Sequence, residues 1–362
     1  MIEHAYIHIP FCKRKCHYCS FISGLDIEKK EQYLSALCDE IDYKYKKEFL
    51  KTIYLGGGTP SLLKTEDLEQ ILSKFNWNDE TEITIEVNPE TVTLEKFLKL
   101  KEIGFNRISM GVQTFDNKLL KEIGRNHSEK DIYNAIDIIK NSGFNNISID
   151  LIYGLPNQTM DLWKQDLEKS VNLDIQHISS YGLKIEENSF FYKNHPKNLP
   201  DDEVQALMFT ELCTYLRKND FSHYEISNFA KKGFESNHNC AYWKNKNYYG
   251  FGLNASGYEQ NIRYKNLCSF EEYIKNPTMY EEEESLTKTE TMENEIFLAL
   301  RLKEGINIQE INKKYNIEFE KTYKKIIDKY SKLELLKIEN NFCKLTEEGF
   351  LLSNEIMSEF IN

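Results

Sequence analysis

Short apolar runs alternate with longer amphipathic segments along the first half of the chain. Runs rich in β-branched residues predict six buried strands, at residues 5–9, 52–55, 82–87, 107–111, 146–152 and 177–183. Apolar residues at helical spacing predict helices between them, at residues 29–45, 66–75, 94–103, 129–141 and 161–171. Such alternation predicts parallel strands joined by right-handed crossovers. A closed barrel needs eight such units, so we expect an α/β fold with an open, partial (β/α)6 barrel.

The rest of the chain has a different pattern. Residues 186–285 contain the aromatic and asparagine-rich stretch SNHNCAYWKNKNYYGFGLNASGY and end in an acidic run, 281–284, which we predict to be a linker. Beyond it, three helices and a hairpin are predicted, with hairpin strands at 335–338 and 342–345 around Asn340 and Asn341. We therefore expect a partial barrel in residues 1–185, a barrel extension in 186–285, and a C-terminal winged-helix-like α+β domain in 286–362.

The composition restricts the class of protein. The 362 residues carry 46 Lys and Arg against 58 Asp and Glu, so the formal charge of −12 argues against non-specific binding to nucleic acid or anionic lipid. The predicted C-terminal domain has 12 basic against 14 acidic residues, which favours a packing or lid role over DNA binding. Without a long apolar run, a signal-peptide layout or a disulfide-like cysteine spacing, we expect a reduced, cytoplasmic protein.

Three of the eight cysteines lie close together directly after the first predicted strand. They are Cys12, Cys16 and Cys19, in the stretch YIHIPFCKRKCHYCSF. Three thiolates from one loop can bind three corners of a 4Fe–4S cube and leave the fourth iron open to another ligand. The alternative is a zinc site completed by His17 or by a distant histidine.

Polar and glycine-rich residues also occur where each of the other predicted strands ends. They are GGGTP after the second strand, Glu86 and Asn88 at the third, Gln113 at the fourth, Asp150 at the fifth and Tyr181 at the sixth. Active sites of parallel α/β folds form at the carboxyl ends of the strands. We expect these side chains and the three cysteines to share one site.

The pattern Cys12-x-x-x-Cys16-x-Tyr18-Cys19, preceded by YIHIPFC, resembles the radical S-adenosylmethionine (SAM) family of oxygen-independent coproporphyrinogen dehydrogenase-like proteins. The resemblance extends over nearly the whole chain. It implies a 4Fe–4S cluster on Cys12, Cys16 and Cys19, with the open iron chelated by the amino and carboxylate groups of SAM. It also implies that SAM contacts come from nine positions: Tyr6, Tyr18, Gly57, Gly58, Thr59, Glu86, Gln113, Arg125 and Asp150.

Two features resemble the heme chaperone branch of that family. The dehydrogenase branch has a fourth cysteine two positions after the third, and this chain has Phe21 there. The stretch HNCAY fits the HNxxY pattern that is associated with heme in the chaperone branch, which implies that His238 and Tyr242 contact heme. The alternative for His238 is a histidine with satisfied hydrogen bonds in an aromatic core.

The resemblance implies a heme chaperone that binds heme and a SAM-ligated 4Fe–4S cluster and transfers heme to an acceptor protein. Its expected partners are heme, an acceptor apoprotein and an electron donor for the cluster, with a homodimer and contact with membrane-bound acceptors both compatible with the sequence. Two alternatives stay open: an oxygen-independent coproporphyrinogen III dehydrogenase, and a radical SAM enzyme that modifies the heme ring. The cluster machinery permits SAM cleavage, but binding SAM is no proof of turnover.

Overall fold

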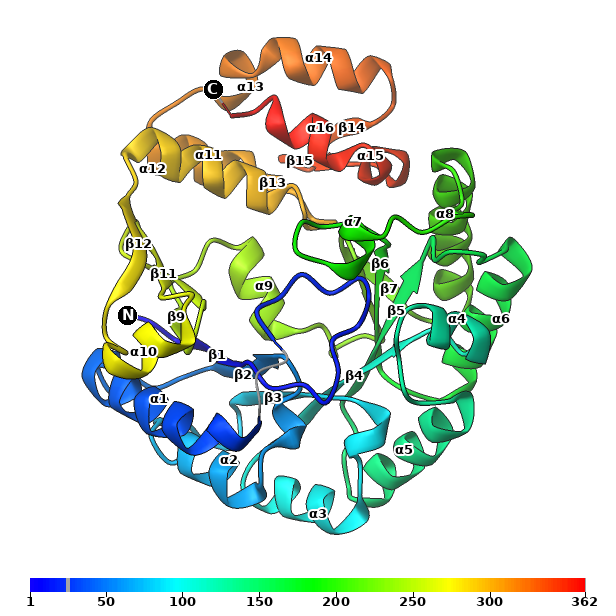
Figure 1. The fold of residues 1–362 in the computed structure, drawn as a ribbon. Helices are drawn as coiled ribbons and strands as arrows, with labels where there is room; N and C mark the ends of the chain where they lie inside the picture. Colours follow the sequence, from blue (N-terminus) through cyan, green and yellow to red (C-terminus); the bar gives the residue numbers. More distant parts are fainter. Residues whose placement is uncertain (24–26, 362) are drawn as a thin grey trace.

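The computed structural model of the chain describes residues 1–23 and 27–361 (Figure 1). Its central sheet has nine strands in the order β7-β8-β6-β5-β4-β3-β2-β1-β9. Neighbouring strands from β1 to β6 are parallel, which confirms the predicted α/β partial barrel. These six strands are β1 (His4–Ile9), β2 (Thr52–Gly57), β3 (Glu82–Val87), β4 (Arg107–Gln113), β5 (Ile147–Tyr153) and β6 (His177–Gly182).

Helices follow the parallel strands and surround the sheet on its outer side (Figure 1). The amphipathic spacing explains this arrangement, since each helix buries one apolar stripe against the strands, as α5 does with Ile132, Ile136 and Ile139. The five predicted helices are confirmed, and the six-residue α4 is an addition that is too short for a periodic signal. The helices are α1 (Lys30–Lys44), α2 (Thr65–Leu72), α3 (Leu94–Glu102), α4 (Asn117–Glu122), α5 (Glu129–Asn141) and α6 (Met160–Asn172).

Residues 186–285 extend the sheet at both of its edges, so the sheet is wider than the six strands predicted. At one edge, β7 (Ser222–Glu225) and β8 (Asn228–Ala230) follow β6 in antiparallel pairing. At the other edge, β9 (Tyr249–Phe251) pairs with β1 in parallel. These strands have three or four residues, too few for a recognisable alternation. The helices of this segment are α7 (Phe190–Lys193), α8 (Asp202–Lys218), α9 (Asn237–Trp243) and α10 (Phe270–Lys275).

The acidic run at 281–284 is a strand, so the prediction of a linker there is wrong. It belongs to β12 (Tyr280–Ser285), which pairs with β11 (Ile262–Asn266), and β11 pairs in turn with β10 (Ser256–Glu259). The register sets Glu284 opposite Arg263 and Glu282 opposite Lys265. Opposite charges across a strand pair stabilise the sheet, which is how an acidic sequence is accommodated there.

The C-terminal segment lies to one side of the barrel, at the top of Figure 1. The predicted hairpin is confirmed, with positive φ at Asn340 (51°) and Asn341 (67°), as a two-residue hairpin turn requires. Short helices make this segment more helical than predicted, and its comparison with a winged helix and the three domain boundaries stay predictions. Its elements are α11 (Lys288–Ala299), β13 (Ile306–Asn307), α12 (Ile308–Tyr315), α13 (Phe319–Thr322), α14 (Lys324–Lys332), β14 (Leu336–Glu339), β15 (Phe342–Leu345), α15 (Glu347–Leu351) and α16 (Ser353–Ser358).

Across residues 1–23 and 27–361, no helix combines the length and the apolar character that crossing a membrane requires.

Candidate functional site

A cavity of about 440 Å³ opens where the carboxyl ends of the parallel strands meet the cysteine loop. The loop crosses the centre of the barrel in Figure 1. Most of the residues predicted for the cluster and for SAM line this one cavity: Cys12, Cys16, Tyr18, Cys19, Gly57, Gly58, Thr59, Glu86, Gln113, Arg125 and Asp150. The structure thus brings together residues that are up to 138 positions apart in the sequence (150 − 12).

The three cysteine thiols face the cavity without bonding to one another. Cys12 Sγ lies 3.6 Å from Thr59 Oγ1, and Cys19 Sγ lies 3.8 Å from Ser23 Oγ. The guanidinium of Arg125 donates to Cys16 Sγ at 3.5 Å. All three cysteines are partly exposed and free. Separate thiols around one shared cavity fit a polynuclear cluster, in which each cysteine binds a different iron.

The zinc alternative finds less support in the geometry. The ring nitrogen Nδ1 of His17 donates to the carbonyl oxygen of Glu122 at 2.7 Å, and the ring packs 4.5 Å from that of Phe190. In the part of the chain that the structure describes, no three His, Cys, Asp or Glu side chains are grouped to hold a single metal ion.

The glycine loop after β2 lies against the cysteine loop after β1. The N–H of Gly58 donates to the carbonyl of Ile9 (2.8 Å) and that of Thr59 to the carbonyl of Phe11 (2.7 Å). A side chain at Gly57 would be strained, because its φ is +109° and a Cβ would lie 2.5 Å from the His8 ring. A Cβ at Gly58 would lie 2.5 Å from the Phe11 carbonyl oxygen. The glycines therefore let the two loops approach closely.

Glu86 on β3 and Asp150 on β5 are two carboxyl groups that line the cavity and lie close enough for their charges to interact. Glu86 accepts from the Tyr54 hydroxyl (2.9 Å) and the Gly57 N–H (3.0 Å), while Ser109 Oγ donates to Asp150 (3.4 Å). Burial, and then the nearby Asp150 charge, raise the pKa of Glu86 to about 7, although both hydrogen bonds and Arg107 oppose the shift. Burial also raises the pKa of Asp150. Such a pair favours a ligand with positive groups, as the ammonium and sulfonium of SAM are.

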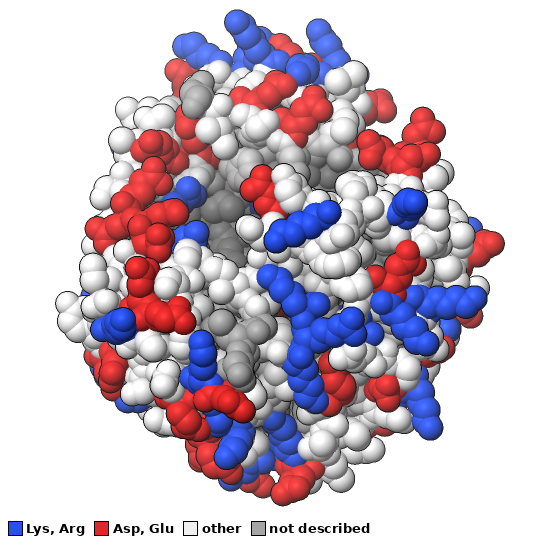
Figure 2. Space-filling view, in the orientation of Figure 1, with Lys and Arg blue, Asp and Glu red and all other residues white. Residues whose placement is uncertain are grey.

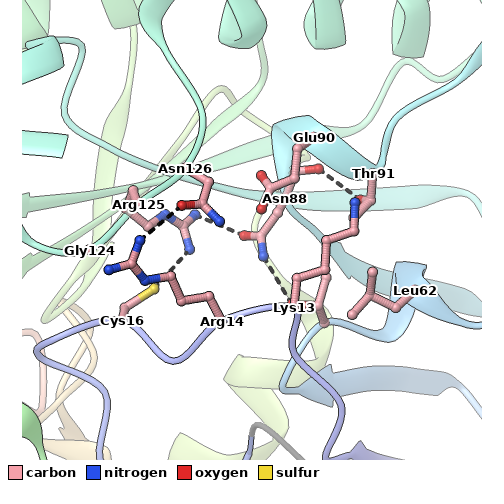
Figure 3. A pocket seen from close by; sticks show the side chains of 11 residues that line it. Lys13, Arg14, Cys16, Leu62, Asn88, Glu90, Thr91, Gly124, Arg125 and Asn126 are labelled. Carbon is pink, nitrogen blue, oxygen red and sulfur yellow. Dashed lines mark hydrogen bonds between the residues drawn. The ribbon is translucent and has the colours of Figure 1, made fainter. Parts of the chain in front are cut away.

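Arg125 connects the cysteine loop to the third and fourth strands (Figure 3). Besides Cys16, its guanidinium donates to Asn88 Oδ1 (2.8 Å) and to the carbonyl oxygen of Gly111. A Cβ at Gly111 would lie 2.6 Å from the guanidinium, so this approach requires glycine. Gln113, two residues later, has a φ of +70° at a break in the β4–β5 register. This local distortion lies at the cavity wall, where strained backbone is typical of binding sites.

Basic side chains surround the mouth of the cavity. Lys13, Arg14 and Lys15 are exposed in the cysteine loop, and Lys184 reaches the cavity from the segment after β6. Figure 2 shows Lys and Arg side chains gathered over the centre of the molecule, where Figure 1 has the cysteine loop. Against the net charge of −12, this local concentration favours the approach of an anionic group.

Tyr6 does not line the cavity, although it is among the predicted SAM contacts. Its ring stacks on Tyr54 with centroids 6.1 Å apart, and its hydroxyl lies 3.0 Å from His8 Nδ1. Tyr6 therefore contacts Tyr54, whose hydroxyl donates to Glu86.

The HNxxY residues lie apart from the cavity, on α9. His238 is 1% exposed, and its ring nitrogens are 2.7 Å from Thr52 Oγ1 and 2.7 Å from the Tyr242 hydroxyl. Burial lowers the pKa of His238 well below its usual value, so the imidazole is neutral. The ring stacks on Tyr54 at 5.0 Å. In this conformation His238 has no free ring nitrogen, and its predicted contact with heme stays a prediction.

Tyr242 faces a second cavity of about 550 Å³ between α9 and the β10–β12 sheet. Tyr242 and Tyr248 pack edge to face there at 4.5 Å, beside Trp243. Its charged lining consists of Lys246, Arg263, Lys265, Glu282 and Glu284.

Sequence reasoning missed three residues around the carboxyl pair: Tyr54, Arg107 and Ser109. The position of Tyr54 could have been predicted from the sequence. Residues two apart on a strand share a face, and Tyr54 lies two residues before Gly56, the first residue of the GGGTP loop. Arg107 begins a strand and is 1% exposed, and no local pattern distinguishes it from a surface arginine.

Comparison with known families gives two matches. Residues 6–169 match the Radical SAM superfamily, and residues 286–352 match the HemN C-terminal domain. Over almost the full length of both chains, the sequence is 40% identical to heme chaperone HemW of Lactococcus lactis (99% of this chain, 97% of the relative) and 36% identical to that of Bacillus subtilis (99% of each). The fold is similar to that of coproporphyrinogen III oxidase (HemN) from Escherichia coli, with a TM-score of 0.88, 23% identity, and coverage of 99% of this chain and 90% of that one.

Proposed function

The chain belongs to the radical SAM superfamily and, within it, to the heme chaperone HemW family, and on this premise we propose that it binds heme beside a SAM-ligated 4Fe–4S cluster and transfers heme to an acceptor protein. One observation carries the proposal: three cysteines and eight of the nine predicted SAM contacts line a single cavity at the carboxyl ends of the strands. The two curated relatives, which match over nearly their whole lengths, bear the name of a heme chaperone.

The residues of the first cavity divide into two groups by their chemistry. Cys12, Cys16 and Cys19 would hold the cluster through their thiolates, and one-electron reduction is the chemistry that such a cluster supplies when bound. Glu86 would bind the SAM ammonium and Asp150 the ribose hydroxyls, because both carboxyl groups are acceptors that line the cavity. Arg125 would pair with the SAM carboxylate through its planar guanidinium.

Phe21 favours the chaperone over the dehydrogenase alternative. Its side chain is 63% exposed and lines the same cavity as the cysteines. In the dehydrogenase branch a cysteine stands at this position, so the chain lacks that branch's thiol at the cavity rim. An exposed phenyl ring there offers apolar surface at the mouth instead.

Heme is proposed to meet the HNxxY motif in the second cavity, through Tyr242. The cavity volume lies in the range of ligand sites, and its tyrosines and Trp243 offer flat apolar surface to a porphyrin. Lys265 pairs with Glu282 at 3.7 Å, whereas Arg263 and Lys246 form no ion pair with any residue that the structure describes. These two cations are suited to the heme propionates. His238 would coordinate iron only after its bonds to Thr52 and Tyr242 break.

The test is a spectrophotometric titration of the cluster-loaded protein with heme, followed by addition of apomyoglobin as a heme sink. We expect saturable binding of heme and transfer of the unmodified heme to the apoprotein. A protein that binds no heme under anaerobic conditions, with or without SAM, would contradict the proposed function.

A further inference from the structure

The buried side of the HNxxY motif points into the barrel, toward the carboxylate that is proposed to bind SAM. We propose that His238 is a positioning residue for that site: it holds the Tyr54 ring so that the Tyr54 hydroxyl donates to Glu86. This role rests on the proposed assignment of Glu86 to SAM, and it applies to the heme-free protein.

Hydrogen bonds fix α9 to the strands that carry the proposed SAM site. The carboxylate of Glu82 accepts from the backbone N–H groups of Asn237 and His238, each at 3.0 Å. Glu82 lies on the same strand and the same face as Glu86, four residues before it. His238 Nδ1 is bound to Thr52, which lies two residues before Tyr54 on β2. The imidazole therefore has a fixed place relative to both strands.

The Tyr54 ring is held by contacts with two other rings. It stacks on the His238 ring (5.0 Å, 25° between planes) and on the Tyr6 ring (6.1 Å, 30°). A tyrosine stacked on two rings has little rotational freedom, so its hydroxyl stays directed at Glu86 Oε1, 2.9 Å away. A small side chain at position 238 would remove one of these two contacts.

The Tyr54 hydroxyl also affects the charge on Glu86. A hydroxyl that donates to a carboxylate stabilises its ionised form, which is the form that binds an ammonium group. The other groups around Glu86 are Gly57 N–H on β2, Arg107 on β4, the carboxyl of Asp150 on β5, and the hydroxyls of Tyr6 on β1, Tyr181 on β6 and Tyr242 on α9. Asp150 opposes ionisation, so the Tyr54 bond matters more than it would beside a lone carboxylate.

The experiment measures SAM affinity of the cluster-loaded, heme-free protein by equilibrium dialysis between pH 6 and 8.5. The variants are Tyr54→Phe, which keeps the ring and removes the hydroxyl, and His238→Ala. The titration of the SAM amino group affects the wild type and every variant equally. The ratio of variant to wild-type affinity at each pH therefore reports the ionisation of Glu86. The control is Tyr273→Phe, which removes a buried tyrosine–carboxylate bond (Tyr273 to Glu40, 2.6 Å) outside the cavity.

We expect Tyr54→Phe to raise the midpoint pH of SAM binding by about one unit, the value of one charge-assisted hydrogen bond. Its affinity would be about five-fold weaker at pH 7 and would approach the wild-type value by pH 8.5. His238→Ala should shift the midpoint in the same direction, while Tyr273→Phe leaves it unchanged.

An unshifted midpoint in Tyr54→Phe or in His238→Ala would overturn the positioning role, even where heme affinity changes. If the wild-type protein itself binds no SAM, the proposed function fails together with this inference. If the wild type binds SAM and both variants show the same pH dependence of SAM affinity as the wild type, the inference alone is overturned.

Discussion

Replacing Glu86 by Gln should weaken SAM binding and stabilise the protein at the same time. The ionised carboxylate offers SAM one or two charge-assisted hydrogen bonds, so Glu86→Gln should cost about ten- to a hundred-fold in affinity at pH 8. With a pKa of about 7, wild-type Glu86 is about one-tenth ionised at pH 6 and nine-tenths ionised at pH 8. The SAM affinity of the wild type should therefore fall about ten-fold from pH 8 to pH 6. This fall is in addition to any change with pH that Glu86→Gln also shows.

The stability change has the opposite sign. The folded pKa of Glu86 is raised from 4.5 to about 7, so between these values the folded protein holds more protons than the unfolded chain. The free energy of unfolding then falls as pH rises through this window, by up to about 3 kcal/mol. Glutamine at this position cannot ionise and avoids that loss. Urea unfolding at pH 5 and pH 8 should show the variant gaining stability relative to the wild type only at the higher pH.

The matched control is Glu225→Gln. Burial raises the pKa of Glu225 to about 7 as well, but Glu225 does not line the first cavity. It should show the same gain in stability with unchanged SAM affinity. Parallel affinity curves for the wild type and Glu86→Gln from pH 6 to 8 would refute the assignment of Glu86 to SAM.

Three further predictions follow from the same geometry. Replacing all three cysteines of the loop by serine should abolish the binding of about four irons per chain after anaerobic reconstitution, and stoichiometric zinc in the anaerobic wild type would contradict the cluster. Arg125→Gln should make the midpoint potential of the SAM-free cluster more negative, because it removes a donor to Cys16 Sγ; an unchanged potential in a redox titration followed by electron paramagnetic resonance would oppose this. His238→Ala and Tyr242→Phe should each weaken heme binding by about 1–3 kcal/mol without loss of iron from the cluster, and equal affinities with an unshifted Soret band would exclude both contacts.

The parallel strands of the barrel could be predicted because their short β-branched runs alternate with amphipathic helical segments. The flanking strands β7, β8 and β9 could not, since they form only where a neighbouring strand offers an unpaired edge. The prediction for the acidic β12 was wrong for a related reason: Glu284 lies opposite Arg263, and Glu282 opposite Lys265, 21 and 17 positions away in the sequence (284 − 263 and 282 − 265). Local composition does not record such pairing.

The candidate site, like the fold, could be predicted where local motifs define it and not where tertiary packing does. The cavity-lining residues that were predicted belong to motifs with fixed spacing, such as the cysteine loop and the glycine loop, or end a strand, as Gln113 does. Arg107 was missed because its burial beside Glu86 and Asp150 follows from tertiary packing. The surroundings of His238 could not be predicted either, because its partners Thr52 and Tyr54 come from a strand more than 180 residues earlier in the sequence (238 − 54 = 184).

The most direct test of heme trafficking is to incubate the reduced, cluster-loaded protein with SAM and either heme or coproporphyrinogen III, and to identify the tetrapyrroles by mass spectrometry. The account predicts that heme is recovered bound and chemically intact and that the porphyrinogen keeps all of its carboxyl groups. Loss of carboxyl groups would establish the dehydrogenase alternative. An opened or alkylated macrocycle would establish a heme-modifying enzyme, and either result would contradict the account.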